Sequence, residues 1–234
     1  MNAQDISKLP HARTRIKICG LTREQDVDAA VAAGADAVGF VLYAPSPRAV
    51  TPERAAQLAR RLPPFVTPVL LFVNEPATNV IAASALVAGA TIQFHGDESP
   101  QDCLAATHQG ARPYLRAARI PLGDGAASFD LVKYSYDYSH AQAILLDAHV
   151  EGFGGSGKAF NWSLLPPSVS SDLVLSGGLT PANVSDGIRL VRPWAVDVSS
   201  GIEVSKGIKS ADKMQAFVAA VRAADAASPS PQRT

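Results

Sequence analysis

A cysteine and an aspartate lie at the ends of two apolar stretches of this sequence. Cys19 is near the end of "RIKICG" (15–20), and Asp147 is near the end of "QAILLDA" (142–148). Lys17 shares a strand face with Cys19, about 7 Å away along an extended chain, and a nearby cation lowers the pKa of a thiol. Apolar neighbours favour the protonated form of a carboxyl group, as a general acid requires. The pair predicts a thiolate base and a carboxylic acid, with a packed cysteine and a salt-bridged aspartate as the alternatives.

Glycine-rich segments follow the last apolar stretches of the chain. Glycines let backbone N–H groups approach an anion, so "SGG" (176–178) and "SSG" (199–201) predict a phosphate site, with simple tight turns as the alternative. "GFGGSGK" (152–158) partly matches dinucleotide and nucleotide phosphate loops, but Pro166 and Pro167 cut short the helix that both require. We expect it to form a wall or lid instead. The predicted phosphate-binding residues are Gly155, Ser156, Gly157, Gly177, Gly178, Ser199, Ser200 and Gly201.

Four further polar residues are candidates for orienting a substrate. Arg48 lies in "APSPRAVTPE" (44–53), where prolines stiffen the chain, and a guanidinium binds a carboxylate through two hydrogen bonds. Gln93 and His95 share one face of their strand, and Asp197 interrupts an apolar strand. We expect these four residues to bind substrate. The alternatives are a surface arginine, a core histidine and a structural aspartate.

The order of elements predicts how these side chains are positioned. Eight apolar stretches alternate with helix-like segments, and Thr22, Thr51 and Thr180 are expected helix caps. The pattern predicts an α/β fold, a single (β/α)8 TIM barrel over residues 15–225, with tails at 1–14 and 226–234. A doubly wound open sheet is the alternative. In a barrel, the active site lies at the carboxyl ends of the strands, where the candidate residues are found.

Composition excludes several classes of protein. The formal net charge is zero, 47% of the 234 residues are hydrophobic, and there are two cysteines. This balance argues against a nucleic-acid-binding surface, and two cysteines make neither a disulfide framework nor a metal cluster. We find no secretory signal and no apolar stretch long enough to span a membrane. We therefore expect a cytoplasmic protein with no nucleic-acid or membrane partner, either a monomer or a homodimer.

Seven segments in register resemble the phosphoribosylanthranilate isomerases of tryptophan biosynthesis. They are "KICGLT", "GFVLYAPSPRAVTPE", "FVN", "QFHGDE", "LLDA…GGSGKAFNW", "LSGGLTPANV" and "VDVSSGIE". Together they cover most of the chain from residue 17 to about residue 209. The resemblance implies a barrel enzyme that needs neither metal nor organic cofactor.

The resemblance also implies a reaction and a role for each residue. The family catalyses the Amadori rearrangement of N-(5-phosphoribosyl)anthranilate to 1-(2-carboxyphenylamino)-1-deoxyribulose 5-phosphate. Cys19 is then the base that removes the C2 proton, and Asp147 is the acid that protonates the furanose oxygen. Arg48 lies near the anthranilate carboxylate, and the glycine-rich loops bind the phosphate. Another phosphosugar isomerase or lyase on a similar barrel, and a non-catalytic barrel, are the alternative functions.

Overall fold

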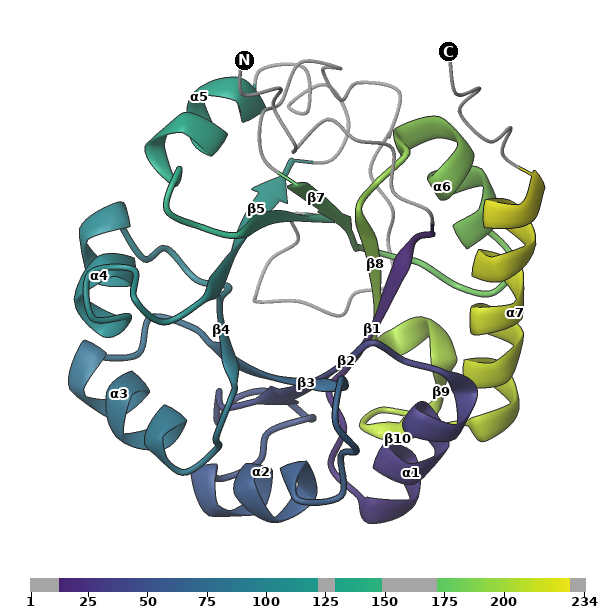
Figure 1. Ribbon diagram of the computed structural model, residues 1–234, viewed down its shortest axis with the longest axis horizontal. Coiled ribbons are helices and arrows are strands. Elements are labelled where there is room, and N and C mark those ends of the chain that lie inside the picture. Colours follow the sequence, from purple (N-terminus) through teal and green to yellow (C-terminus); the bar gives the residue numbers. More distant parts are fainter. Residues whose placement is uncertain (1–12, 122–128, 149–171, 228–234) are drawn as a thin grey trace, which may run out of the picture.

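Eight parallel strands close into a barrel in chain order, with helices around it (Figure 1). The computed structural model describes residues 13–121, 129–148 and 172–227. The predicted barrel is confirmed, and the open sheet is ruled out because β8 pairs with β1. The strands are β1 (Arg15–Cys19), β2 (Ala37–Val41), β3 (Thr67–Phe72), β4 (Thr91–Phe94), β5 (Tyr114–Ile120), β6 (Ala143–Ala148), β7 (Asp172–Leu175) and β8 (Ala195–Val198).

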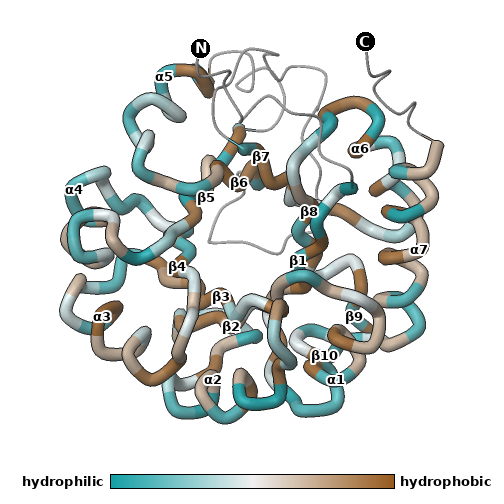
Figure 2. Tube along the Cα trace, viewed as in Figure 1, coloured by the Kyte–Doolittle hydropathy of each residue, from teal (hydrophilic) through white to brown (hydrophobic). Residues whose placement is uncertain are grey.

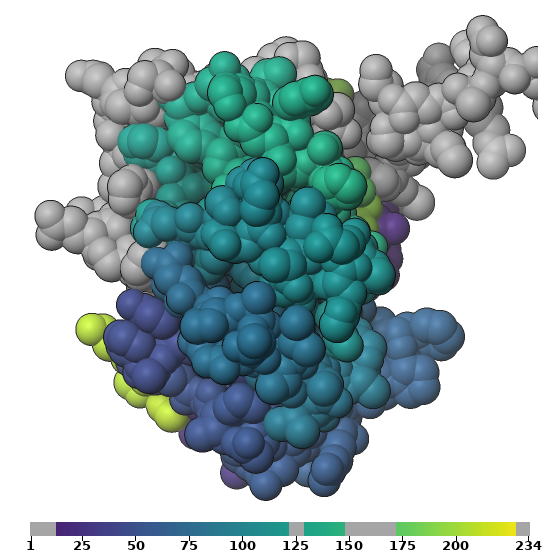
Figure 3. Space-filling view, turned by 90° about the vertical axis from the view of Figure 1, so that its left-hand side faces the viewer, coloured from purple at the N-terminus to yellow at the C-terminus, as the bar shows by residue number. Residues whose placement is uncertain are grey.

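The helices follow the strands and cover the outside of the barrel. They are α1 (Glu24–Ala33), α2 (Pro52–Ala59), α3 (Ala77–Ala85), α4 (Pro100–Ala106), α5 (Leu131–Asp137), α6 (Val184–Val191) and α7 (Ala211–Ala227). Figure 3 shows one outer face, over which α2 to α5 succeed one another in chain order, from blue to green. None of the helices in the described residues is long and apolar enough to cross a membrane. The segments 1–12 and 228–234 lie outside the described residues.

Side chains of each strand alternate between the helical layer and the barrel interior. Ile16 and Ile18 pack into the main hydrophobic cluster, together with the helical residue Val27. A separate, smaller cluster fills the barrel interior; its fully or nearly fully buried members are Val69, Leu115, Ala117, Ala143, Leu145, Val174 and Ala195. Figure 2 shows the strands as mostly brown, in keeping with burial on both faces. Lys17 and Cys19 therefore face away from the helices, as their spacing predicts.

The helix starts were predicted with mixed success. Thr51 caps α2 by accepting a hydrogen bond from the backbone N–H of Arg54, with a proline in the first turn. Thr22 does not cap α1, because its hydroxyl donates to the carbonyl of Gly207 and the helix begins at Glu24. Thr180 does not cap α6 either. Its backbone N–H donates to the side chain of Asn183, and the helix begins after that turn.

After β8 the chain forms a short 3-10 helix, Ser200–Ile202, and a small antiparallel pair of strands, β9 (Glu203–Ser205) and β10 (Ile208–Lys209). The pair lies between β8 and the long helix α7. Glu203 and Lys209 are register partners, and Lys209 is buried. These two strands bring the paired side chains of Glu203 and Lys209 close to Ser199, the residue after β8.

Candidate active site

The thiol of Cys19 is enclosed inside the barrel, at the carboxyl end of β1. It is 4% exposed and packs with Val41, Leu71 and Val73. Burial raises the pKa of this thiol above its ordinary value, while the Lys17 ammonium acts in the opposite direction. The sequence therefore predicted the direction of the lysine's effect correctly, but burial outweighs it. The thiolate is the disfavoured form, and a strong base once it forms.

Lys17 is itself held by a carboxylate from the neighbouring strand. Its Nζ lies 2.8 Å from Oδ1 of Asp197, and the two residues are register partners on β1 and β8. Burial lowers the pKa of Lys17, but Asp197 and Cys19 outweigh this effect, so the pKa lies above its usual value. Asp197 was predicted to bind substrate; its observed partners are this lysine and, at 3.5 Å, the hydroxyl of Ser176. Both side chains are nearly fully buried.

Asp147 lies at the end of β6 and is contacted by His95, the residue that follows β4. Nε2 of His95 is 2.9 Å from Oδ2 of Asp147, and Nδ1 of His95 is 3.0 Å from Nε2 of Gln93. All three side chains are buried. Gln93 and His95 were predicted to bind substrate, whereas the contacts that the structure gives them run to each other and to the candidate acid.

The Arg48 guanidinium is paired with a carboxylate from the same chain. Its Nε and Nη2 lie 2.7 and 2.9 Å from the two oxygens of Glu203, and Nζ of Lys209 lies 2.8 Å from Oε1 of Glu203. Burial raises the pKa of Glu203, but Arg48 and Lys209 outweigh it and hold the pKa below its usual range. Sequence reasoning missed Glu203, although it is the last residue of the quoted segment "VDVSSGIE".

The loops after β7 and β8 touch through glycine. Gly177 and Gly178 have φ angles of 76° and 68°, in the left-handed region that favours glycine. A Cβ on Gly201 would lie 1.9 Å from the carbonyl oxygen of Leu179, so these two loops require glycine where they meet. Nζ of Lys209 donates to the carbonyl of Ser199 at 2.9 Å. The predicted residues Gly155, Ser156 and Gly157 lie outside the described residues.

A glycine on β2 leaves room for the sulfur. Gly39 is the register partner of Cys19, and a Cβ added to it would lie 2.6 Å from Sγ. Gly20, with φ 78°, similarly faces Arg48, whose Cδ would lie 2.5 Å from an added Cβ. Sequence reasoning did not select Gly39. Its only signal was a glycine inside an otherwise apolar strand, which often marks a close approach.

The second cysteine of the chain lies on α4. Cys103 is fully buried in the helical layer, and burial raises its pKa to about 12, so this thiol is poorly reactive. Within residues 13–121, 129–148 and 172–227, no group of three or more histidine, cysteine or acidic side chains is placed to hold a metal ion.

Comparisons with known proteins agree with one another. A family model described as N-(5'-phosphoribosyl)anthranilate (PRA) isomerase matches residues 16–220. The chain is 62% identical to the N-(5'-phosphoribosyl)anthranilate isomerase of Methylibium petroleiphilum over 214 residues, which cover 92% of this chain and 96% of the relative.

Solved structures of related barrels superpose over most of the chain. The phosphoribosyl anthranilate isomerase of Thermotoga maritima matches with a TM-score of 0.79 and 38% identity, covering 90% of this chain and 99% of that one. A further such isomerase, in complex with reduced 1-(o-carboxyphenylamino)-1-deoxyribulose 5-phosphate, matches with a TM-score of 0.76 and 35% identity. It covers the same shares of the two chains.

Proposed function

The chain belongs to the N-(5'-phosphoribosyl)anthranilate isomerase family, and we propose that it performs this isomerisation of tryptophan biosynthesis by general acid–base catalysis. The related enzyme with a bound reduced product supports the substrate class. One observation carries the mechanism: a buried thiol ends β1 and a buried carboxyl group ends β6, at the same end of one barrel. In such barrels, that end holds the active site.

In the proposed reaction, Asp147 gives a proton to the furanose oxygen of the substrate. The bond between C1 and that oxygen breaks, while the nitrogen lone pair forms a C1=N⁺ iminium. The iminium acidifies the C2 proton, which the Cys19 thiolate removes. The electrons of the C2–H bond form a C1=C2 bond and neutralise the nitrogen. The resulting enolamine tautomerises to the aminoketose, so atoms and charges balance without a redox step.

The thiol requires help to act as a base, and Lys17 supplies it. Burial disfavours the thiolate, and the Lys17 ammonium stabilises it by charge. Asp197 holds that ammonium in place at 2.8 Å. We therefore assign Lys17 and Asp197 to the support of the base, beside the substrate-binding role expected for Asp197.

The two anionic ends of the substrate have separate binding groups. The glycines after β7 and β8 support a phosphate site, because they allow backbone N–H groups to approach an anion closely. Arg48 is the group for the anthranilate carboxylate. Since its Nε and Nη2 are bonded to Glu203, Nη1 is the nitrogen that we expect to meet the substrate.

Replacement of each catalytic group tests the mechanism. Cys19→Ala and Asp147→Asn are each expected to lower kcat by about 10²–10⁴-fold, with KM little changed, because a general acid or base contributes on this scale. The assay is the change in anthranilate-type fluorescence as substrate turns over. Cys103→Ala, which removes the other thiol, is the matched control and should retain kcat. Wild-type kcat in either active-site variant would refute the assigned role.

A further inference from the structure

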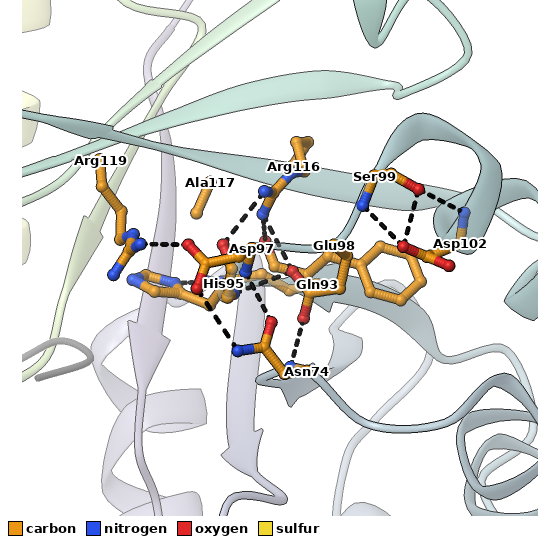
Figure 4. Close-up of polar contacts among 12 residues, drawn as sticks. Asn74, Gln93, His95, Asp97, Glu98, Ser99, Asp102, Arg116, Ala117 and Arg119 are labelled. Carbon is orange, nitrogen blue, oxygen red and sulfur yellow. Dashed lines mark hydrogen bonds and ion pairs between the residues drawn. The ribbon is translucent and has the colours of Figure 1, made fainter.

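Asp147 is hydrogen-bonded to His95, the residue after β4, and through it to Gln93 of β4. Gln93 Nε2 is 3.0 Å from His95 Nδ1, and His95 Nε2 is 2.9 Å from Asp147 Oδ2. Gln93 and His95 are two residues apart on the interior face of the barrel, and Figure 4 shows both below the β5 residues Arg116 and Arg119. The order of donors and acceptors along this series of hydrogen bonds determines which ring nitrogen of His95 carries the hydrogen.

An amide nitrogen can only donate, so Nδ1 of His95 must accept from Gln93. A neutral imidazole that accepts at Nδ1 carries its hydrogen on Nε2. Nε2 then donates to Oδ2 of Asp147. The carbonyl oxygen of a carboxylic acid is the better acceptor, so this hydrogen bond favours a proton of Asp147 on Oδ1.

The buried environment of Gln93 selects this orientation of its amide. Among the described residues, its Oε1 is buried without a hydrogen-bond partner. If the amide were reversed, the buried group without a partner would be an NH₂ with two hydrogens. An unpaired carbonyl oxygen is tolerated more often in protein interiors than an unpaired N–H. The orientation that donates to His95 is therefore the less costly one.

The backbone around His95 is held from the helical layer. Arg116 donates to the carbonyls of Phe94 and Gly96, on either side of His95, each at 3.1 Å (Figure 4). The charge of Arg116 is balanced by Glu98 at 3.1 Å, and both side chains are 4% exposed. Glu98 also accepts from the backbone N–H of Gly96 at 2.9 Å. These contacts restrain the imidazole in the position from which it reaches Asp147.

We propose that Gln93 and His95 are positioning residues for the acid: they keep His95 in the Nε2–H tautomer, so that Oδ2 of Asp147 is held as an acceptor and Oδ1 carries the proton for the substrate. This inference rests on the proposed role of Asp147. After proton transfer, the His95 N–H stabilises the new carboxylate. A histidine protonated on Nδ1 instead would accept the proton of Asp147 and hold it away from the sugar.

The first test measures the tautomer directly. In the unliganded protein labelled with ¹⁵N-histidine, we expect the ring nitrogens of His95 to give the pattern of a neutral imidazole with its hydrogen on Nε2. The chain has five histidines, and a His95→Gln variant assigns the signal by its loss. An Nδ1–H or doubly protonated ring would overturn the inference. This measurement requires no turnover, so it stands apart from the proposed function.

The second test reverses the hydrogen bond. Gln93→Glu has nearly the same shape, but its carboxylate accepts from Nδ1–H and so removes the donor that faces Asp147. We expect kcat to fall about 10²-fold or more with KM changed little, since a wrong histidine tautomer disables proton transfer. Gln93→Met, the apolar control, should lower kcat less, because it removes the donor to Nδ1 without supplying an acceptor that imposes the opposite tautomer. An unchanged kcat, or a rise in KM alone, would overturn the proposal.

The third test asks whether the effect passes through Asp147. In an Asp147→Asn background, Gln93→Glu should cause little further loss, because the group that it misdirects is already gone. A full additional loss would show that Gln93 acts elsewhere and would overturn the inference. If Asp147→Asn alone kept wild-type kcat, the proposed acid would fail, whereas the tautomer measurement would still report on the Gln93–His95 pair.

Discussion

The substitution Gly39→Ala tests the geometry of the base without replacing any catalytic group. The new Cβ would lie 2.6 Å from Sγ of Cys19 and 3.2 Å from its Cα. Non-bonded heavy atoms prefer separations of about 3.5–4.0 Å, so the sulfur must move by about 1 Å. The φ angle of Gly39 lies outside the left-handed region, so alanine causes no backbone strain there.

A shift of this size is large for a proton transfer. A displacement of about 1 Å in a reacting group can cost about 10²-fold in rate, which corresponds to about 2.7 kcal/mol in the activation barrier. Overpacking is expected to cost a further 1–3 kcal/mol, roughly, in the free energy of unfolding. We therefore expect Gly39→Ala to fold, to bind substrate with nearly unchanged KM, and to lose about 10²-fold in kcat.

The assay combines steady-state fluorescence with urea unfolding. The Cys19→Ala/Gly39→Ala double variant provides the control, because removal of the sulfur should restore part of the stability that Gly39→Ala loses in the presence of Cys19. A wild-type kcat in Gly39→Ala would refute the inferred position of the sulfur. Strict additivity of the two stability losses would show that the side chains do not meet.

Two other predictions concern Arg48 and the carboxylate with which it pairs, that of Glu203. Arg48→Ala should raise KM about tenfold or more with a smaller change in kcat, whereas Arg61→Ala, which removes a surface arginine paired with Asp28, should leave KM unchanged in the same assay. Because Arg48 and Lys209 hold the pKa of Glu203 below its ordinary value of 4.5, the ionised Glu203 contributes stability that is present above that pH and lost as the pH falls below it. Glu203→Gln should therefore be less stable than the wild type at pH 7 and show a shallower loss between about pH 5 and pH 3 when unfolding is followed by urea titration. Parallel curves for the two proteins would contradict the assigned pairing.

The sequence by itself determined the architecture and the faces of the strands. Eight alternating units predicted the closed barrel, because the periodicity of apolar residues depends only on positions that are close together in the sequence. Ile16 and Ile18 pack toward the helices, and Lys17 and Cys19 face the interior, as a period of two requires. Thr51 before Pro52 also marked a helix start correctly, since a cap involves only neighbours in the chain.

Only the tertiary structure decided which side chains meet. Arg48 and Glu203 are 155 residues apart in sequence, and His95 and Asp147 are 52 residues apart. Their contacts depend on strand register, which no local pattern encodes. Thr22 failed as a cap for the same reason, because its hydroxyl has a partner 185 residues away. Residue types and spacing thus indicate which groups can do chemistry. Packing across neighbouring strands determines the hydrogen-bond partners and the protonation state of each group.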